Sequence, residues 1–142
     1  MLKAGTIVLL VLFILTAGYS IVDILAPSST LEGDFQAVTG GSYEGILESG
    51  PLSVSLLYLR HLGVANLAIS IAAVFILLAG FSKAQRWAWW GLLVTGGLVL
   101  GFGTVVNLII ANWFDFTVHL VALLWLLAGL LIPVNAFFTK RV

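Results

Sequence analysis

The chain alternates between long apolar runs and short polar segments. Four runs reach the length of about 20 residues that a helix needs to cross a bilayer, and they cover residues 6–26, 56–81, 87–111 and 116–138. Their hydrophobicity is continuous and does not alternate, which disfavours porin-type strands. Because a helix satisfies its own backbone hydrogen bonds in lipid, each run is predicted to be a transmembrane helix.

The composition supports this prediction. Hydrophobic residues make up 61% of the chain and charged residues 8%, with a mean hydropathy of +1.18, whereas roughly a quarter of the residues of a soluble domain are charged. The net charge is zero, so no basic field is present to bind nucleic acid. The absence of cysteine excludes disulfides, thiolate metal sites and cysteine nucleophiles. We predict one domain, residues 1–142, embedded in a lipid bilayer.

The basic residues predict an orientation. Five of the six lysines and arginines lie at the two termini or in the second connection, namely Lys3, Lys83, Arg86, Lys140 and Arg141. These three places share one side of a protein with four spans, and the positive-inside rule assigns that side to the cytoplasm. The acidic residues lie mainly in the other two connections. We therefore expect a multi-pass protein of the cell (cytoplasmic) membrane with both termini inside.

The connections predict an all-α, up-down four-helix bundle with a long first extracytoplasmic loop. Residues 82–86 and 112–115 form short connections, which make neighbouring helices antiparallel. Residues 27–55 form the long loop, which opens with Pro-Ser-Ser-Thr and closes with Ser-Gly-Pro, both of them turn and helix-start signals. Within the loop, Tyr43 to Glu48 could form a short helix capped by Ser42.

The apolar residues of this loop favour a lid that lies on the bundle; they are Leu31, Phe35, Val38, Ile46 and Leu47. A mobile acidic loop fits the same composition. The sequence leaves both interpretations open.

Five polar residues inside the spans share one depth, near the extracytoplasmic side: Asp23, Arg60, His61, Asn107 and His119. A charge within a membrane costs a few kcal/mol on insertion scales, so these positions are informative. Helical spacing groups both histidines with small residues, which mark the faces where membrane helices touch. These positions suggest a polar chamber in the outer half of the bundle, and ligand binding there is one hypothesis.

A structural role is the other hypothesis, and the one that the position of these residues near the membrane interface favours. Asp23 and Arg60 would then form an ion pair between the first two helices. Asn107 and His119 would make interhelical hydrogen bonds of modest strength.

Two histidines on diagonal helices of a bundle suggest a metal centre. A haem or chlorin held between His61 and His119 is one hypothesis, and a zinc or copper site completed by an aspartate is another. A histidine beside a carboxylate would also form an acid–base pair. No hydroxyl nucleophile or phosphate-binding loop accompanies it, so the sequence assigns no catalytic residue and favours a protein that is not an enzyme.

Glycines at positions 97, 101 and 103 form a small-residue surface on the third predicted helix. Such a surface lets helix backbones approach closely. It serves either internal packing or docking of another membrane subunit.

Two stretches, Tyr58-Leu-Arg-His-Leu-Gly-Val-Ala-Asn-Leu and Lys83-Ala-Gln-Arg-Trp-Ala-Trp-Trp, resemble a broad group of uncharacterised prokaryotic four-helix membrane proteins, loosely similar to the DoxX group. That group shares the long first outer loop and the Arg-Trp-Ala-Trp turn before the third helix. The resemblance implies a prokaryotic cell membrane. It carries no agreed activity and transfers no site residues.

These observations predict a non-enzymatic protein that works by association, as an accessory or scaffold subunit of a larger respiratory or photosynthetic membrane complex. Its partners would be lipid and other membrane subunits or further copies of itself. The alternative is a small binding or transport protein. It would hold a lipid, a quinone, or a tetrapyrrole or metal cofactor in the polar chamber.

Overall fold

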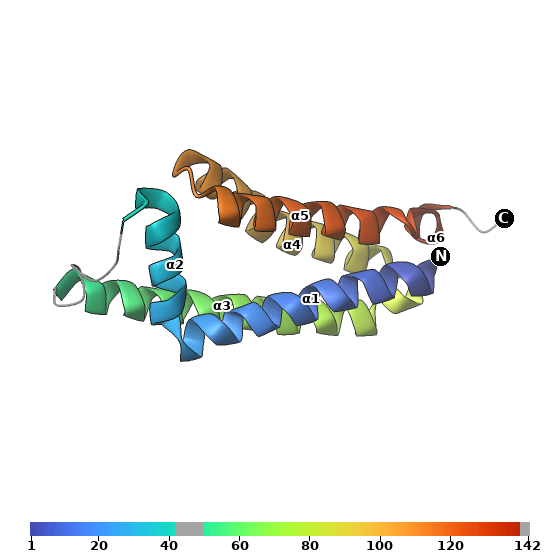
Figure 1. The fold of residues 1–142 in the computed structure, drawn as a ribbon. Helices are drawn as coiled ribbons and strands as arrows, with labels where there is room; N and C mark the ends of the chain where they lie inside the picture. Colours follow the sequence, from blue (N-terminus) through green and yellow to red (C-terminus); the bar gives the residue numbers. More distant parts are fainter. Residues whose placement is uncertain (42–49, 140–142) are drawn as a thin grey trace.

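The computed structural model describes residues 1–41 and 50–139. Over these ranges the chain is all-α (Figure 1). The long helices are α1 (Leu2–Leu25), α3 (Gly50–Ala79), α4 (Arg86–Ile109) and α5 (Trp113–Leu131). The shorter elements are α2 (Pro27–Thr39), the 3-10 helix η2 (Phe81–Lys83) and α6 (Val134–Phe138). Each long helix has the length and composition of a membrane span, which confirms the predicted bundle and supports an integral membrane protein.

The four long helices form two antiparallel pairs (Figure 1). Helix α1 lies along α3, and α4 lies along α5, while contacts between α1 and α5 join the pairs. The start of α1, η2 and α6 lie together at what we call the terminal end. The pairs diverge toward the opposite end, the α2 end, where α2 stands across them beside the α4–α5 turn.

The prediction of a long loop over residues 27–55 is wrong for residues 27–39, which form helix α2. Helix α2 begins at Pro27, whose fixed φ suits the first turn of a helix. It ends before Gly40, which adopts a left-handed φ of 66°. Helix α3 begins at Gly50, within the predicted start signal and earlier than expected. The short helix predicted at residues 43–48 lies outside the described residues.

The fourth predicted span is interrupted near its end. Helix α5 ends at Leu131, and Pro133 precedes the short helix α6. Proline has no N–H to donate to the preceding turn, so it cannot continue the α5 hydrogen-bond ladder. The chain turns here, and Phe137 of α6 packs into the core.

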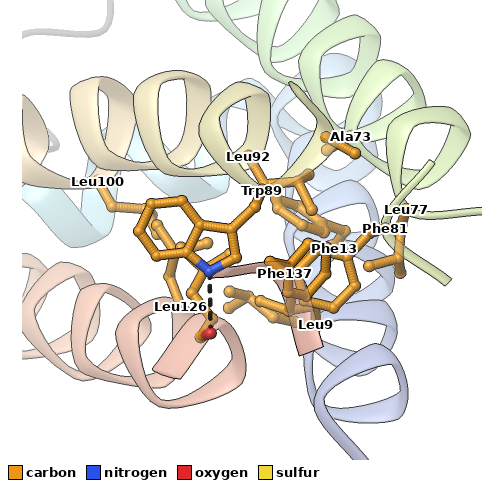
Figure 2. Packing of buried hydrophobic residues seen from close by; sticks show 13 residues of the cluster. Leu9, Phe13, Ala73, Leu77, Phe81, Trp89, Leu92, Leu100, Leu126 and Phe137 are labelled. Atoms are coloured by element: carbon orange, nitrogen blue, oxygen red, sulfur yellow. Dashed lines mark hydrogen bonds between the residues drawn. The ribbon is translucent and has the colours of Figure 1, made fainter. Parts of the chain in front are cut away.

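The buried residues of the hydrophobic core pack closely against one another (Figure 2), and they come mainly from the parts of the helices toward the terminal end. It receives side chains from all four long helices, η2 and α6, including Leu9, Leu77, Phe81, Leu92, Leu126 and Phe137. The rings of Phe81 and Phe137 have centroids 4.7 Å apart. Nε1 of Trp89 donates a hydrogen bond to the Leu130 carbonyl at 3.0 Å, so this buried indole leaves no unpaired N–H.

Glycines allow α1 and α5 to approach closely at the terminal end. A Cβ added to Gly129 would lie 2.6 Å from Cγ of Leu9, and a Cβ added to Gly5 would lie 2.7 Å from the Gly129 carbonyl oxygen. In lipid, close packing of this kind replaces the hydrophobic effect as the force between helices. The contact between α1 and α5 therefore depends on these two glycines.

Candidate functional site

The candidate site is a set of polar side chains at the α2 end. They come from α1, α2, α4, α5 and the α4–α5 turn. Polar groups inside or at the edge of a bilayer need hydrogen-bond partners, because lipid offers none. The partners of each group therefore show how the elements are joined.

Asp23 joins α1 to α2 and lies against α3. The side chain is only 4% exposed, and its Oδ1 accepts a hydrogen bond from the Thr30 hydroxyl at 2.9 Å. A Cβ added to Gly63 of α3 would lie 2.9 Å from Cβ of Asp23. The absence of a side chain at Gly63 thus lets α3 pack directly over this buried carboxylate.

Asn112 joins the α4–α5 turn to α2. It caps the N-terminus of α5, where its Oδ1 accepts a hydrogen bond from the Asp115 N–H at 3.2 Å. Its Nδ2 lies 3.0 Å from Oδ2 of Asp115 and 3.3 Å from Oδ1 of Asp34. The Asn112 side chain is 2% exposed. One buried amide group therefore holds two carboxyl groups from different elements.

Asp34 has an unusual environment for a carboxyl group. Burial, reinforced by a hydrogen bond and the negative charge of Asp115, raises the pKa of Asp34 to about 7. The hydrogen bond from Asn112 opposes this effect, and the more distant charge of Asp23 adds to it. A carboxyl group with such a pKa binds a proton near neutral pH.

Asn107 and His119 pack together between α4 and α5. Nδ1 of His119 lies 2.8 Å from the Asp115 carbonyl oxygen, which only accepts hydrogen bonds, so Nδ1 carries the proton. Nδ2 of Asn107 donates to the Gly103 carbonyl at 3.0 Å and lies 3.4 Å from Nδ1 of His119. The His119 ring occupies the space over Gly103, where a Cβ would clash with it.

Of the predicted chamber residues, the structure places Asp23, Asn107 and His119 in contacts at the α2 end. Arg60 and His61 are exposed on α3, and Nδ1 of His61 lies 2.8 Å from the Leu57 carbonyl oxygen of its own helix. Asp23 takes its hydrogen bond from Thr30 and not from Arg60. The predicted ion pair between Asp23 and Arg60 is therefore wrong.

The prediction that both histidines lie on helix-contact faces is correct for one of them. His119 is half-buried and shares its face with the buried residues Leu126 and Gly129. His61 is exposed, as are the alanines that continue its face, Ala65, Ala68 and Ala72. Helix α3 packs instead through Gly63, Ser70, Ala73 and Leu77. Spacing alone did not reveal this because both faces of α3 are apolar.

Three residues of the site were missed by sequence reasoning: Asp34, Asn112 and Asp115. We treated the two acids only as evidence of orientation. The spacing Asn112, Asp115, His119 is a usable signal, because positions i, i+3 and i+7 share one helix face. Nothing in the spacing of Asp34 indicates that it meets this face.

The described cavities lie elsewhere. A groove of about 210 Å³ runs between α1 and α3, and a cavity of about 20 Å³ lies among α1, α3 and α4. None of the five predicted chamber residues lines either one. Among residues 1–41 and 50–139, no three histidine or acidic side chains are grouped to hold a metal ion. The chamber and its ligand stay predictions. The observed contacts join neighbouring elements and place two carboxyl groups on one amide.

Comparison with protein-family models, curated proteins and solved structures finds no match for this chain.

Proposed function

We propose that the chain is a non-enzymatic integral membrane protein that acts by association, as an accessory or scaffold subunit bound to another membrane helix through α4. The observation that carries this proposal is a pair of glycines, Gly97 and Gly101, that no other part of the described chain packs against. A Cβ added at either would meet nothing within 4 Å. They lie four residues apart within a helix that has the length and hydropathy of a membrane span.

The other glycines in this part of α4 behave differently. A Cβ at Gly96 would lie 2.8 Å from Cδ2 of Leu126, and one at Gly103 would clash with His119. Those two positions serve the contact with α5. The predicted surface of Gly97, Gly101 and Gly103 therefore divides into an internal part and an open part.

The open pair has a disadvantage that a partner helix would offset. Glycine in a helix is less favourable than alanine by about 1 kcal/mol, and lipid contact gives nothing in return. A glycine pair at this spacing, by contrast, is the motif that lets two membrane helices approach closely. The flanking side chains Val94, Leu98 and Val105 are exposed on α4 and would contact the partner beside the glycines.

The test is native mass spectrometry of the protein extracted gently from its own membrane. We expect the 15.2 kDa chain to carry a membrane protein at fixed ratio, and Gly97→Leu with Gly101→Leu to remove it. Gly18→Leu is the matched control, because Gly18 of α1 is also open but has no glycine four residues away. A chain that is always alone contradicts association, and a partner that survives the double substitution contradicts this face.

We also propose that the terminal end faces the cytoplasm. Lys3, Lys83 and Arg86 are exposed there, while Asp34 and Asp115 lie at the α2 end. Because the chain has no cysteine, single cysteines can report the orientation. A membrane-impermeant thiol reagent applied to intact cells should label Ala37→Cys and leave Lys83→Cys unlabelled; the reverse pattern contradicts the orientation.

A further inference from the structure

Helix α2 packs against α3 and α1, and two polar contacts fix it to α1 and to the α4–α5 turn. Near its start, Thr30 donates a hydrogen bond to Asp23 of α1. In its second half, Asp34 accepts one from Asn112, which is 78 residues away in the sequence. Most of the remaining α2 side chains are half-buried or exposed. A change at Asp34 therefore acts on the hydrogen bond that joins α2 to the α4–α5 turn.

That contact brings together two acids. The oxygens of Asp34 and Asp115 both lie within hydrogen-bond distance of Nδ2 of Asn112, and the two carboxyl groups interact directly through a hydrogen bond. Two like charges in such a position are not both stable, and one proton shared between them removes the repulsion. The arrangement resembles a carboxyl dyad, held in place by a buried amide.

None of the groups that shift the pKa of Asp34 is a cation. These groups are Asp115 from α5, Asp23 from α1 and the neutral Asn112 from the α4–α5 turn. The Tyr19 phenol of α1 faces the same carboxylates. On α2 itself, Glu32 is exposed and hydrogen-bonded to Gln36, while Arg60 and His61 of α3 are exposed.

We propose that α2 is a proton-dependent latch, in which a proton shared by Asp34 and Asp115 keeps α2 docked on the α4–α5 turn and its loss releases that part of α2. The contact between Thr30 and Asp23 does not involve this proton, so α2 stays attached to α1 and pivots. The latch is independent of the proposed association through α4, because the two use different residues on different elements.

The direction of the pH effect follows from the two states. In the docked state the pKa of Asp34 is about 7, whereas in a released, hydrated α2 it returns toward the ordinary value of about 4. Docking therefore binds the proton more tightly. The docked state is most favoured below pH about 4, weakens as the pH rises, and changes no further above pH about 7.

Spin labels can measure the release directly in the full-length protein. Cysteines replacing the exposed residues Ala37 of α2 and Phe114 of α5 are labelled in lipid nanodiscs, and the distance between them is measured by double electron–electron resonance from pH 5 to pH 9. We expect one short distance at pH 5 and a longer, broader component that grows with pH. The ratio of the released to the docked population should rise by up to about fivefold between pH 5 and pH 7 and change no further above pH about 7, because solvent screens the half-exposed Asp34.

Two substitutions separate the latch from a general effect of charge. Asp34→Asn should stay docked at every pH, because an amide cannot ionise and still bonds to Asp115. Glu32→Gln, which removes an exposed acid from the same helix, should leave the transition unchanged. The latch is overturned by a distance that does not respond to pH, by a transition that persists in Asp34→Asn, or by one that a chelator abolishes and divalent cations restore.

Discussion

The two ends of the bundle are held together by different interactions. At the terminal end, Phe81, Leu126 and their neighbours fill the space between helices with apolar side chains. At the α2 end, Asn112 and Asp23 join the elements through hydrogen bonds. Helices in a bilayer gain little from leaving water, so apolar packing at the terminal end depends on close fit. The polar contacts at the α2 end depend on complete pairing, because lipid offers no hydrogen-bond partner.

This difference makes the two ends sensitive to different changes. Lost volume or an added methyl group affects the terminal end, where Gly5 and Gly129 allow contact between backbones. A lost partner or a change of pH affects the α2 end, where one amide serves two carboxyl groups. The substitutions below test this contrast, from the largest expected effect to the smallest.

Phe81→Ala should cause the largest loss of stability. Phe81 is fully buried and its ring packs at a tilt against that of Phe137, so its removal leaves a cavity among packed helices. We expect the free energy of unfolding to fall by about 3 kcal/mol, the lower end for a buried aromatic, because the unfolded reference is also apolar. Reversible unfolding in mixed detergent micelles measures this. Phe75→Ala, an exposed phenylalanine on α3, should change it little.

Asn112→Ala should have the next largest effect. It removes the cap of α5 and leaves the carboxyl groups of Asp34 and Asp115 without their shared donor. We expect a loss of about 2 kcal/mol in the same unfolding experiment. Asn135→Ala, at an exposed asparagine of α6, is the control. Equal effects at both positions would show that the amide of Asn112 has no special role.

Two glycines of α4 should respond in opposite directions. Gly103→Ala places a methyl group against the His119 ring and should cost about 1 kcal/mol or more through overpacking. Gly97→Ala meets open space and should stabilise α4 by up to about 1 kcal/mol through helix propensity. Unfolding of the two variants side by side measures the difference. A loss at both positions would mean that Gly97 is also packed within the monomer.

The pH dependence of stability should be the smallest effect. Because the pKa of Asp34 is raised in the folded state to about 7, its contribution is present at low pH and is lost as the pH rises through about 7. Asp34 is half-exposed, so solvent screening should keep the change below about 1 kcal/mol. Unfolding of wild type and Asp34→Asn at pH 5 and pH 8 measures it; a larger loss in Asp34→Asn than in wild type contradicts the assignment.

Much of the fold could be predicted because a bilayer imposes a simple rule on sequence. Apolar runs of sufficient length form helices, and the short connections make neighbours antiparallel. Helix α2 was missed because its polar composition resembles a loop, although Pro27 and Gly40 mark its two ends. Proline and glycine at these places were the better signal.

The candidate site could be predicted only in part. Asn107 and His119 meet because their helices are adjacent and antiparallel, so residues near the shared turn face each other. Arg60 and His61 lie on an exposed face, which the pattern of α3 did not indicate. In a helix that is apolar on all sides, periodicity does not distinguish the packed face from the lipid-facing one.

The sequence by itself determined the four long helices, their order and the segregation of basic and acidic residues, since these follow from hydropathy and charge along the chain. The tertiary structure decided which glycines of α4 contact α5 and which acidic side chains lie close together. Asp34 reaches Asn112 and Asp115 only because α2 stands across the diverging helix pairs. A contact between residues so far apart in the sequence depends on how the helix pairs pack. That packing depends on the close approach of helices at glycines such as Gly5, Gly63 and Gly129.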